Sequence, residues 1–334
     1  MIFESDFVPA RWLRNRHAQT IYAAQRWVWR GRPRLRRELL RLPDGDLTAV
    51  DWHVGSDELP DTAPLLIILH GLEGSAQSPY ARMFLEAAHA LGWRGCVLHF
   101  RDCGDYRNLL PRRYHAGETN DLRHFLNRLH KTPESAENSG PLLAVGFSLG
   151  GNVLLKYLGE SGDTTPLKAA AAVCVPLDLH ACAEALNKGF SKGYQKYLLK
   201  RMKNSVRTKF DRYTAAFDWD KAMRARTFGE FDDLVTAPLH GFDGMEDYYR
   251  KCSSVHFLKG IERPTLILNA LDDPFMTHDV IPPEDALSEF VTLEIAGHGG
   301  HVGFIEGGPP WRPRFFAPGR ILEFLRPNAA MPGL

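Results

Sequence analysis

The sequence lacks the features that mark several classes of membrane and exported protein. No apolar run in its 334 residues reaches the roughly 18 residues that a membrane-spanning helix needs. The N-terminal stretch MIFESDFVPARW carries acids where a signal peptide carries bases, and it has no continuous apolar segment. We therefore expect neither a spanning helix nor a signal peptide.

Cysteine is scarce and scattered. The five cysteines form no CxxC pair, and their number is odd: they are Cys96, Cys103, Cys174, Cys182 and Cys252. Both a disulfide framework and a zinc-finger site need closely spaced or evenly paired cysteines. The pattern favours a reducing compartment, and we expect a cytoplasmic protein.

The chain has almost no excess of either charge, since its 41 Lys and Arg and its 40 Asp and Glu give a net charge of +1. This balance argues against a general nucleic-acid binder, which would be basic. The charge is nevertheless uneven: residues 11–41 hold ten Arg and one acid, and residues 187–226 hold twelve Lys or Arg and three Asp. These basic stretches have three interpretations. They could contact an anionic membrane peripherally, bind an anionic substrate, or form a solvated basic face without a partner.

Short apolar runs alternate with helical patterns along most of the chain. This alternation predicts an α/β fold with a mostly parallel, doubly wound sheet. The first two strands have no helix between them and are expected to form an antiparallel hairpin at one edge. The predicted strands are Arg36–Leu42, Leu47–His53, Leu65–His70, Gly95–Phe100, Leu142–Phe147, Ala169–Val175, Thr265–Asn269 and Val291–Ile295, and the predicted helices are Pro79–Leu91, Glu118–Leu129, Gly150–Leu158 and Ile321–Phe324.

The alternation stops between residues 176 and 262. This segment is polar, basic and helical in pattern, and it lies between two predicted strands. We expect one domain over residues 1–334, with 176–262 as an inserted helical cap over the strand ends where open α/β sheets bind ligands. Ordinary connecting helices without a lid role are the alternative.

A G-x-S-x-G motif spans Gly146 to Gly150, with Ser148 at its centre. An apolar strand enters the motif and a helical stretch leaves it, which is the context of a nucleophile elbow. The turn is expected to be so tight that only glycine fits at positions 146 and 150. Ser148 is therefore our candidate nucleophile, at the N-terminus of a helix whose dipole favours developing negative charge.

A serine nucleophile also needs donors for the oxyanion that forms after attack. In this strand–turn–helix arrangement, one N–H comes from the loop after an earlier strand and one from the residue after the serine. We assign these roles to Leu72 and Leu149. His70, in the same loop, is favoured as a structural residue over a catalytic one, because a loop histidine usually satisfies backbone groups.

The acid and the base should follow the serine in that order. Asp272 and Asp273 end a predicted strand, and we prefer Asp273, leaving Asp272 to brace the loop. His298 and His301 follow the last strand in a glycine-rich loop, and we prefer His301 as the base. We expect no metal, since this pair lies on a loop instead of a helix face and no third ligand cluster is evident.

Four segments carry a family resemblance: FVPARWLRNRHAQTIY, HGLEGS, YHAGETNDLRHFL and HGGHVGF. With a spaced pattern from Asp232 to Asp273, they resemble the YheT-like branch of the α/β-hydrolase superfamily over nearly the whole chain. The resemblance implies an α/β-hydrolase fold and hydrolysis of lipid or medium-chain acyl esters, and its triad maps onto Ser148, Asp273 and His301. One departure is Asp102, which is expected to add negative charge near the pocket.

These observations favour a serine hydrolase that cleaves short- to medium-chain or lipid carboxylic esters through an acyl-enzyme. Its partner is then a small-molecule ester or lipid, with no nucleic acid and no cofactor. Two alternatives remain open. One is an acyltransferase that uses an alcohol acceptor, and the other is a non-catalytic membrane- or lipid-binding scaffold with a vestigial triad.

Overall fold

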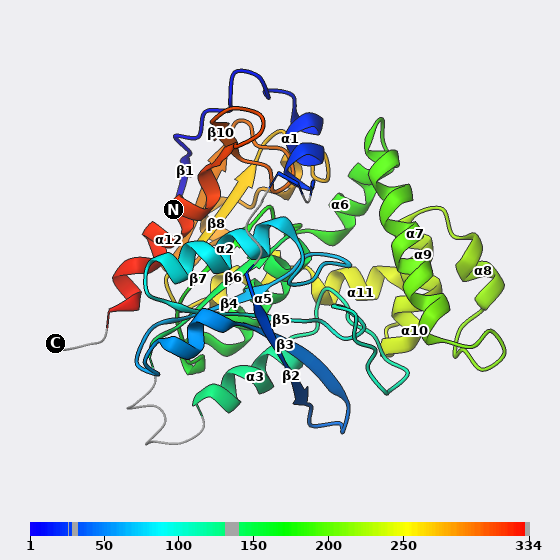
Figure 1. Cartoon of the computed structure of the whole chain (residues 1–334). Helices are drawn as coiled ribbons and strands as arrows, with labels where there is room; N and C mark the ends of the chain where they lie inside the picture. Colours follow the sequence, from blue (N-terminus) through cyan, green and yellow to red (C-terminus); the bar gives the residue numbers. More distant parts are fainter. Residues whose placement is uncertain (26, 29–32, 131–139, 331–334) are drawn as a thin grey trace.

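A nine-stranded sheet forms the centre of the molecule (Figure 1). The computed structural model describes residues 1–25, 27–28, 33–130 and 140–330. The strand order is β1-β9-β8-β7-β6-β4-β5-β3-β2, and all neighbours are parallel except β2–β3 and β3–β5. The predicted α/β fold and its antiparallel edge hairpin are confirmed. The strands are β1 (Ile2–Glu4), β2 (Leu35–Arg41), β3 (Leu47–His53), β4 (Leu65–Leu69), β5 (Arg94–Leu98), β6 (Leu142–Phe147), β7 (Leu167–Val173), β8 (Thr265–Ala270) and β9 (Val291–Ala296), with β10 (Ile305–Gly307) and β11 (Arg314–Phe315) in a separate pair.

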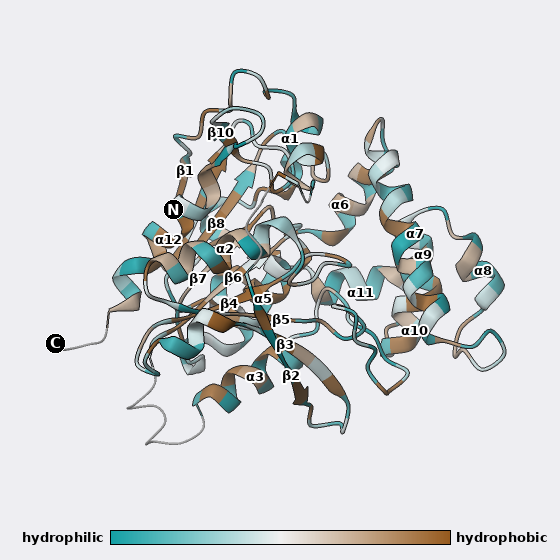
Figure 2. Cartoon of the chain, viewed as in Figure 1, coloured by the Kyte–Doolittle hydropathy of each residue, from teal (hydrophilic) through white to brown (hydrophobic). Residues whose placement is uncertain are grey.

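Both faces of the sheet are buried, which explains its continuous apolar strands. In β4, Leu65, Ile67 and Leu69 join one hydrophobic cluster while Leu66 and Ile68 join the other, because successive side chains point to opposite faces. Helices α3 (Asn120–His130) and α5 (Leu149–Ser161) pack on the first face. Helices α2 (Pro79–Ala90) and α12 (Phe316–Leu325) pack on the second. Figure 2 shows the alternating apolar and polar bands of an amphipathic helix along α3.

The segment between β7 and β8 is helical and lies to one side of the sheet (Figure 1). It has a hydrophobic cluster of its own, which includes Leu199, Met202 and Phe231. Its helices are α6 (Leu179–Leu186), α7 (Ser191–Lys209), α8 (Trp219–Arg224), α9 (Phe228–Phe231), α10 (Ala237–His240) and α11 (Met245–Cys252).

The strands that flank this segment are direct neighbours in the sheet. The side chain of Asn269 in β8 clamps the point where the chain leaves β7. Val175 N–H donates to Asn269 Oδ1 at 2.9 Å, and Asn269 Nδ2 donates to Val175 O at 3.2 Å. The chain therefore leaves the sheet for the helical segment directly after Val175, whose N–H and carbonyl groups both bond to the Asn269 side chain.

Several elements differ from the sequence predictions, and the short strands β10 and β11 are among those that were not predicted. Strand β1 and helix α1 (Arg16–Ala23) were not expected. Strand β1 has three residues and pairs only with β9, so its periodicity is too short to recognise. Helix α12 begins before the predicted start at Ile321, because a proline such as Pro318 is tolerated in the first turn of a helix.

Two further expectations concern membranes and cysteines. Within the described ranges, no helix combines the length and the apolar character that crossing a bilayer requires. All five cysteines are free and buried. The expectation of no disulfide framework therefore agrees with the structure.

A buried arginine joins three parts of the fold. Arg101, 2% exposed, donates to Asp44 Oδ2 at 2.7 Å, to Asp46 Oδ2 at 3.0 Å and to Asp121 Oδ1 at 2.7 Å. Asp44 and Asp46 lie in the β2–β3 turn, and Asp121 lies in α3. One guanidinium thus compensates three carboxylates around the loop after β5.

Replacing this arginine should destabilise the protein far more than removing a surface ion pair. Arg101→Ala leaves buried carboxylates without a counter-ion, and we expect a loss of about 3–5 kcal/mol in the free energy of unfolding. The control is Arg128→Ala, which removes an exposed pair with Glu38 and should cost less than about 1 kcal/mol. Urea denaturation measures both, and equal losses would contradict the assigned role of Arg101.

Candidate active site

Ser148 occupies a sharp turn between β6 and α5. Its backbone has φ 51° and ψ −120°, a conformation that residues other than glycine rarely adopt. Its N–H donates to Val173 O in β7 at 2.9 Å. A Cβ on Gly146 would lie 2.5 Å from Gly150 O, and one on Gly150 would lie 2.4 Å from His70 O. The turn therefore requires glycine at both positions.

The loop after β4 runs beside this turn and is held by His70. The Nδ1 atom of His70 lies 2.8 Å from Gly71 O, and its Nε2 atom accepts from Phe100 N–H at 3.2 Å. These contacts are consistent with a neutral ring protonated at Nδ1. Burial lowers the pKa of His70 to about 3, so the ring stays neutral and its role is structural.

Leu72 and Leu149, the two candidate oxyanion donors, line the same cavity as Ser148. Leu149 is the first residue of α5, so its N–H has no acceptor within the helix. Among the described residues, Leu72 N–H makes no hydrogen bond. Both N–H groups are therefore available to a substrate oxygen.

The residue after Leu72 is locked by side chains that the sequence analysis did not identify. Glu73 has φ 52°, and its N–H donates to Tyr114 Oη at 2.9 Å. Tyr114 Oη and Arg113 Nη2 each donate to Glu73 Oε1 at 2.9 Å. The resemblance segment YHAGETNDLRHFL begins at Tyr114, but a sequence motif alone does not say which loop a tyrosine holds.

Asp273 and His301 form a buried pair. His301 Nδ1 lies 2.8 Å from Asp273 Oδ2, and the two side chains are 12% and 0% exposed. Asp273 Oδ1 accepts from Phe275 N–H at 2.8 Å. The Phe275 ring stacks on the imidazole at 4.0 Å between centroids and 7° between planes. The ring of His301 is therefore held in one orientation, and no residue in the described part of the chain forms a hydrogen bond with its Nε2 atom.

The competing pair lies apart from this one. His298 Nδ1 is 3.3 Å from Asp272 Oδ2, and the His298 side chain is 58% exposed. Asp272 Oδ1 accepts from Gly300 N–H at 2.8 Å. Asp272 thus braces the loop that carries His301, while His298 lines neither of the cavities that Ser148 lines.

Helix α1, which the sequence analysis missed, supports the same loop. Thr20 Oγ1 accepts from His301 N–H at 2.9 Å. A Cβ on Gly300 would lie 2.5 Å from Arg16 O, so this close approach needs glycine. The resemblance segment RHAQT contains Thr20, but nothing in its pattern indicates that it contacts a loop far along the chain.

Two cavities meet at Ser148, and His301 lines both. The narrow cavity, of about 120 Å³, leads from Ser148 toward the helical segment; the wide cavity, of about 740 Å³, opens beside α1 and α7. Within the described chain, no hydrogen bond joins Ser148 Oγ to His301. The structure thus brings acid and base into contact and places the serine on the same cavity walls.

One group of side chains here has ligand atoms close enough to hold a metal ion. Cys174, Asp273 and His301 place one such atom each within 4.8 Å of one another. Burial raises the pKa of the Cys174 thiol well above its ordinary value, and a metal would require the thiolate. The His301–Asp273 hydrogen bond also occupies the Nδ1 atom, so the donor set fits a proton-transfer pair better than a cation.

Asp102 does not line either cavity, contrary to the expectation drawn from the sequence. Its Oδ1 accepts from Lys209 Nζ at 3.0 Å, and its Oδ2 accepts from Arg113 Nε at 3.3 Å. These two cations compensate its charge. Asp102 therefore joins α7 to the loop after β5 instead of adding negative charge to the pocket.

Comparison with known proteins agrees with this geometry. Residues 64–308 match the model of a family described as the alpha/beta hydrolase fold. The chain is 41% identical to "Putative esterase YheT" of Escherichia coli (strain K12), covering 96% of this chain and 93% of that protein. It is 32% identical to "Phospholipase ABHD3" of Homo sapiens, covering 84% of this chain and 73% of that protein. The Pf2001 esterase of Pyrococcus furiosus has a similar fold, with a TM-score of 0.56, 14% identity, and coverage of 89% and 94%.

The close contact at Gly150 generates a stability test. Gly150→Ala pushes a methyl group against backbone carbonyls that cannot move aside, and we expect a loss of about 3 kcal/mol. The control is Gly193→Ala on α7, where nothing lies within 4 Å of the added atom and the free energy of unfolding should rise by about 0.5–1 kcal/mol. Thermal and urea denaturation report both, and a neutral Gly150→Ala would contradict the tight elbow.

Proposed function

The chain belongs to the α/β-hydrolase family, and on this basis we propose that it is a serine hydrolase that cleaves carboxylic esters through Ser148, His301 and Asp273. The observation that carries the proposal is the buried Asp273–His301 hydrogen bond beside the cavities that Ser148 lines. A serine hydroxyl needs such a base to become nucleophilic at neutral pH. The reaction needs no cofactor.

In the proposed mechanism, Ser148 Oγ attacks the ester carbonyl carbon while His301 Nε2 takes the hydroxyl proton. Asp273 holds the ring through Nδ1–H and stabilises the imidazolium. The Leu72 and Leu149 N–H groups donate to the oxyanion of the tetrahedral intermediate. The C–O bond to the alcohol then breaks, and His301 returns the proton to the leaving oxygen.

The second half of the reaction repeats these steps with water. His301 removes a proton from water, whose oxygen attacks the acyl carbon bound to Ser148 Oγ. When this second tetrahedral intermediate collapses, Ser148 recovers its proton from His301 and the carboxylic acid leaves. An alcohol in place of water would give a new ester, so the acceptor alone separates hydrolysis from acyl transfer.

We propose lipid esters or short- to medium-chain acyl esters as the substrate class. The narrow cavity is lined largely by apolar side chains of the helical segment, including Leu186, Leu198, Met202 and Phe228, which suits an acyl chain. The relatives support this class, since they include a phospholipase and the monoacylglycerol lipase of Saccharomyces cerevisiae (strain ATCC 204508 / S288c), which is 31% identical over 74% of this chain and 56% of that protein. In this proposal residues 176–262 act as a cap that forms the acyl pocket.

Apolar side chains stand exposed around the wide cavity. Ile21, Trp27 and Tyr197 line it and are 45%, 56% and 59% exposed. Arg201 lines it as well, and α7 carries further exposed lysines. Exposed apolar groups beside bases fit an anionic lipid surface, so we propose that this rim meets the membrane from which a lipid ester enters.

The proposed triad is tested by matched pairs of variants assayed on p-nitrophenyl esters of rising chain length. Ser148→Ala, His301→Gln and Asp273→Asn should each lower kcat by about three orders of magnitude or more. The neighbouring changes His298→Gln and Asp272→Asn should retain much more activity, because these side chains lie outside the proton path. An equal loss of kcat in Asp273→Asn and Asp272→Asn would refute the assignment of Asp273 as the acid of the triad.

A fluorophosphonate probe separates an active serine from a vestigial one. Wild type should be labelled at Ser148, and Ser148→Ala should not. No labelling of the folded wild type, together with binding to anionic vesicles, would favour a non-catalytic scaffold. Product analysis with added alcohol distinguishes a hydrolase from an acyltransferase.

The membrane contact is tested by sedimentation with vesicles that contain phosphatidylglycerol. We expect wild type to sediment with them at low salt, and the double change Ile21→Ser with Tyr197→Ser to weaken binding several-fold, since apolar area drives insertion. Tyr213→Ser removes an aromatic side chain that is 89% exposed but not on the cavity rim, and it is the control. Equal binding of all three proteins would contradict the proposed surface.

A further inference from the structure

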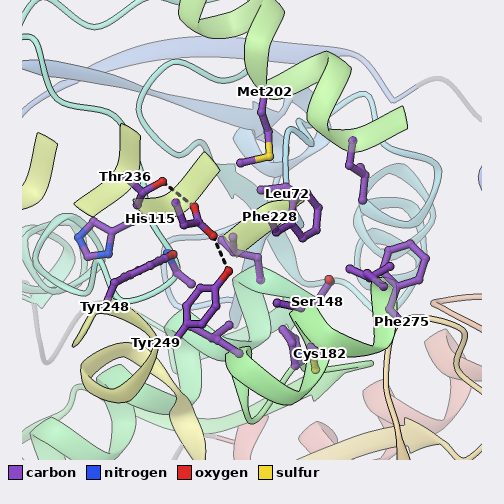
Figure 3. A pocket seen from close by; sticks show the side chains of 18 of the residues that line it. Leu72, His115, Ser148, Cys182, Met202, Phe228, Thr236, Tyr248, Tyr249 and Phe275 are labelled. Atoms are coloured by element: carbon purple, nitrogen blue, oxygen red, sulfur yellow. Dashed lines mark hydrogen bonds between the residues drawn. The ribbon is translucent and has the colours of Figure 1, made fainter. Parts of the chain in front are cut away.

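The narrow cavity has a polar end formed around Asp232. Asp232 Oδ1 accepts from Thr236 Oγ1 at 2.6 Å, and Oδ2 accepts from Tyr249 Oη at 2.8 Å. All three residues line the cavity. In Figure 3, dashed lines mark these two bonds, and Thr236 and Tyr249 lie across the view from Phe275. The cavity thus has the serine on one side and a carboxyl group on another.

Asp232 is buried without a cation as its direct partner. It is 8% exposed, and no lysine or arginine within the described residues forms an ion pair with it. Burial raises its pKa to about 6. A carboxylate has room for about four hydrogen bonds, and Thr236 and Tyr249 supply two. Burying a carboxyl group that has only part of its hydrogen bonds lowers the stability of the protein unless another donor binds to it.

The backbone around Asp232 is also unusual. Residues Asp232–Thr236 form a π-helical turn between α9 and α10. Such turns are rare, carry a wider hydrogen-bonding ring than the α-helix, and frequently occur at functional sites. The next residue, Asp233, is exposed and binds Met245 N–H at the start of α11 at 3.0 Å. Two adjacent aspartates therefore differ: one faces the cavity and the other caps a helix outside it.

We propose that Asp232 is a substrate-binding residue, and that it accepts a hydrogen bond from a hydroxyl group near the far end of the acyl chain bound at Ser148. The inference rests on the proposed ester hydrolysis, whose substrate class it narrows to hydroxylated acyl esters. We assign the acyl half of the ester to the narrow cavity, because that cavity is the more apolar of the two. The wide cavity then has room for the alcohol half.

A hydroxyl group fits this end better than an ammonium or a methyl group. Arg113 also lines the cavity, but it is paired with Glu73 and Asp102. An ammonium would have to give up its hydration in this largely apolar slot, which is costly. A terminal methyl group would desolvate the carboxyl without bonding to it, which is unfavourable. A hydroxyl supplies the missing donor and adds no charge.

Binding to the Ser148→Ala protein tests the subsite without requiring turnover. Titration calorimetry compares methyl esters of ω-hydroxyalkanoic acids with methyl esters of plain alkanoic acids of matched length. At one chain length we expect the hydroxylated ester to bind about tenfold or more tightly, because its hydroxyl reaches the carboxyl only at that length. Plain esters that bind as tightly or more tightly at every length would overturn the inference, as would no detectable binding of either series.

The same comparison on variants assigns the preference to one side chain. In the Ser148→Ala background, Asp232→Asn should reduce the hydroxyl preference several-fold, since a neutral amide oxygen bonds more weakly than a carboxylate. Asp233→Asn is the matched control on the same turn and should keep the full preference. A purely structural role for Asp232 would weaken both ester series equally and leave their ratio unchanged, which would contradict the proposal.

Turnover by wild type keeps the two proposals distinguishable. If wild type hydrolyses plain and hydroxylated esters at equal kcat/KM at every length, the hydroxyl subsite is wrong and the esterase proposal stands. If wild type hydrolyses neither series while Ser148→Ala binds the hydroxylated one more tightly, the subsite stands and the esterase proposal fails.

Discussion

The contact of the first turn of α5 with the loop after β4 is the constraint on which the site depends. Gly150 lies so close to the carbonyl groups of Leu69 and His70 that a single methyl group would not fit. This contact brings Leu72 beside the start of α5, where Leu149 presents its own N–H group. The strained backbone of Ser148 follows from the same geometry, because the chain must reverse from β6 into a helix packed against a neighbouring strand end.

A second layer of contacts holds the loops that approach this turn. Tyr114 and Arg113 bind Glu73 on one side of Leu72, while Thr20 and Asp272 bind the loop of His301. These residues come from widely separated parts of the chain. The site is thus assembled from rigid pieces, each held by hydrogen bonds to backbone groups, and such preorganisation is what an oxyanion-stabilising site requires.

The sequence predicted the parts of the fold that local patterns determine. Short apolar runs predicted the central strands, several of them continuous, such as LLIIL in β4. The motif around Ser148 predicted the turn, because a tight elbow restricts glycine positions directly. The preference for Asp273 and His301 rested on chain order and flanking residues, and the structure places them in one buried pair with Asp272 and His298 apart. What sequence reasoning missed was long-range. Strand β1 and helix α1 depend on partners more than about 280 residues away, and Tyr114 holds Glu73 from 41 residues further along the chain. The pairing of Asp102 with Lys209 compensates the negative charge that was expected near the pocket.

The Asn269 clamp has a consequence for how this architecture diversifies. Because β7 and β8 are already joined by their own ladder and by the side chain at Val175, the intervening helices contribute nothing to the register of the sheet. Insertions or deletions beyond Val175 can therefore leave the pairing of β7 with β8 unchanged. An engineer who exchanged this segment to admit a different molecule would still have to preserve the few bonds that tie it to the loops below, such as Lys209 with Asp102 and Ser191 with the carbonyl of Pro274.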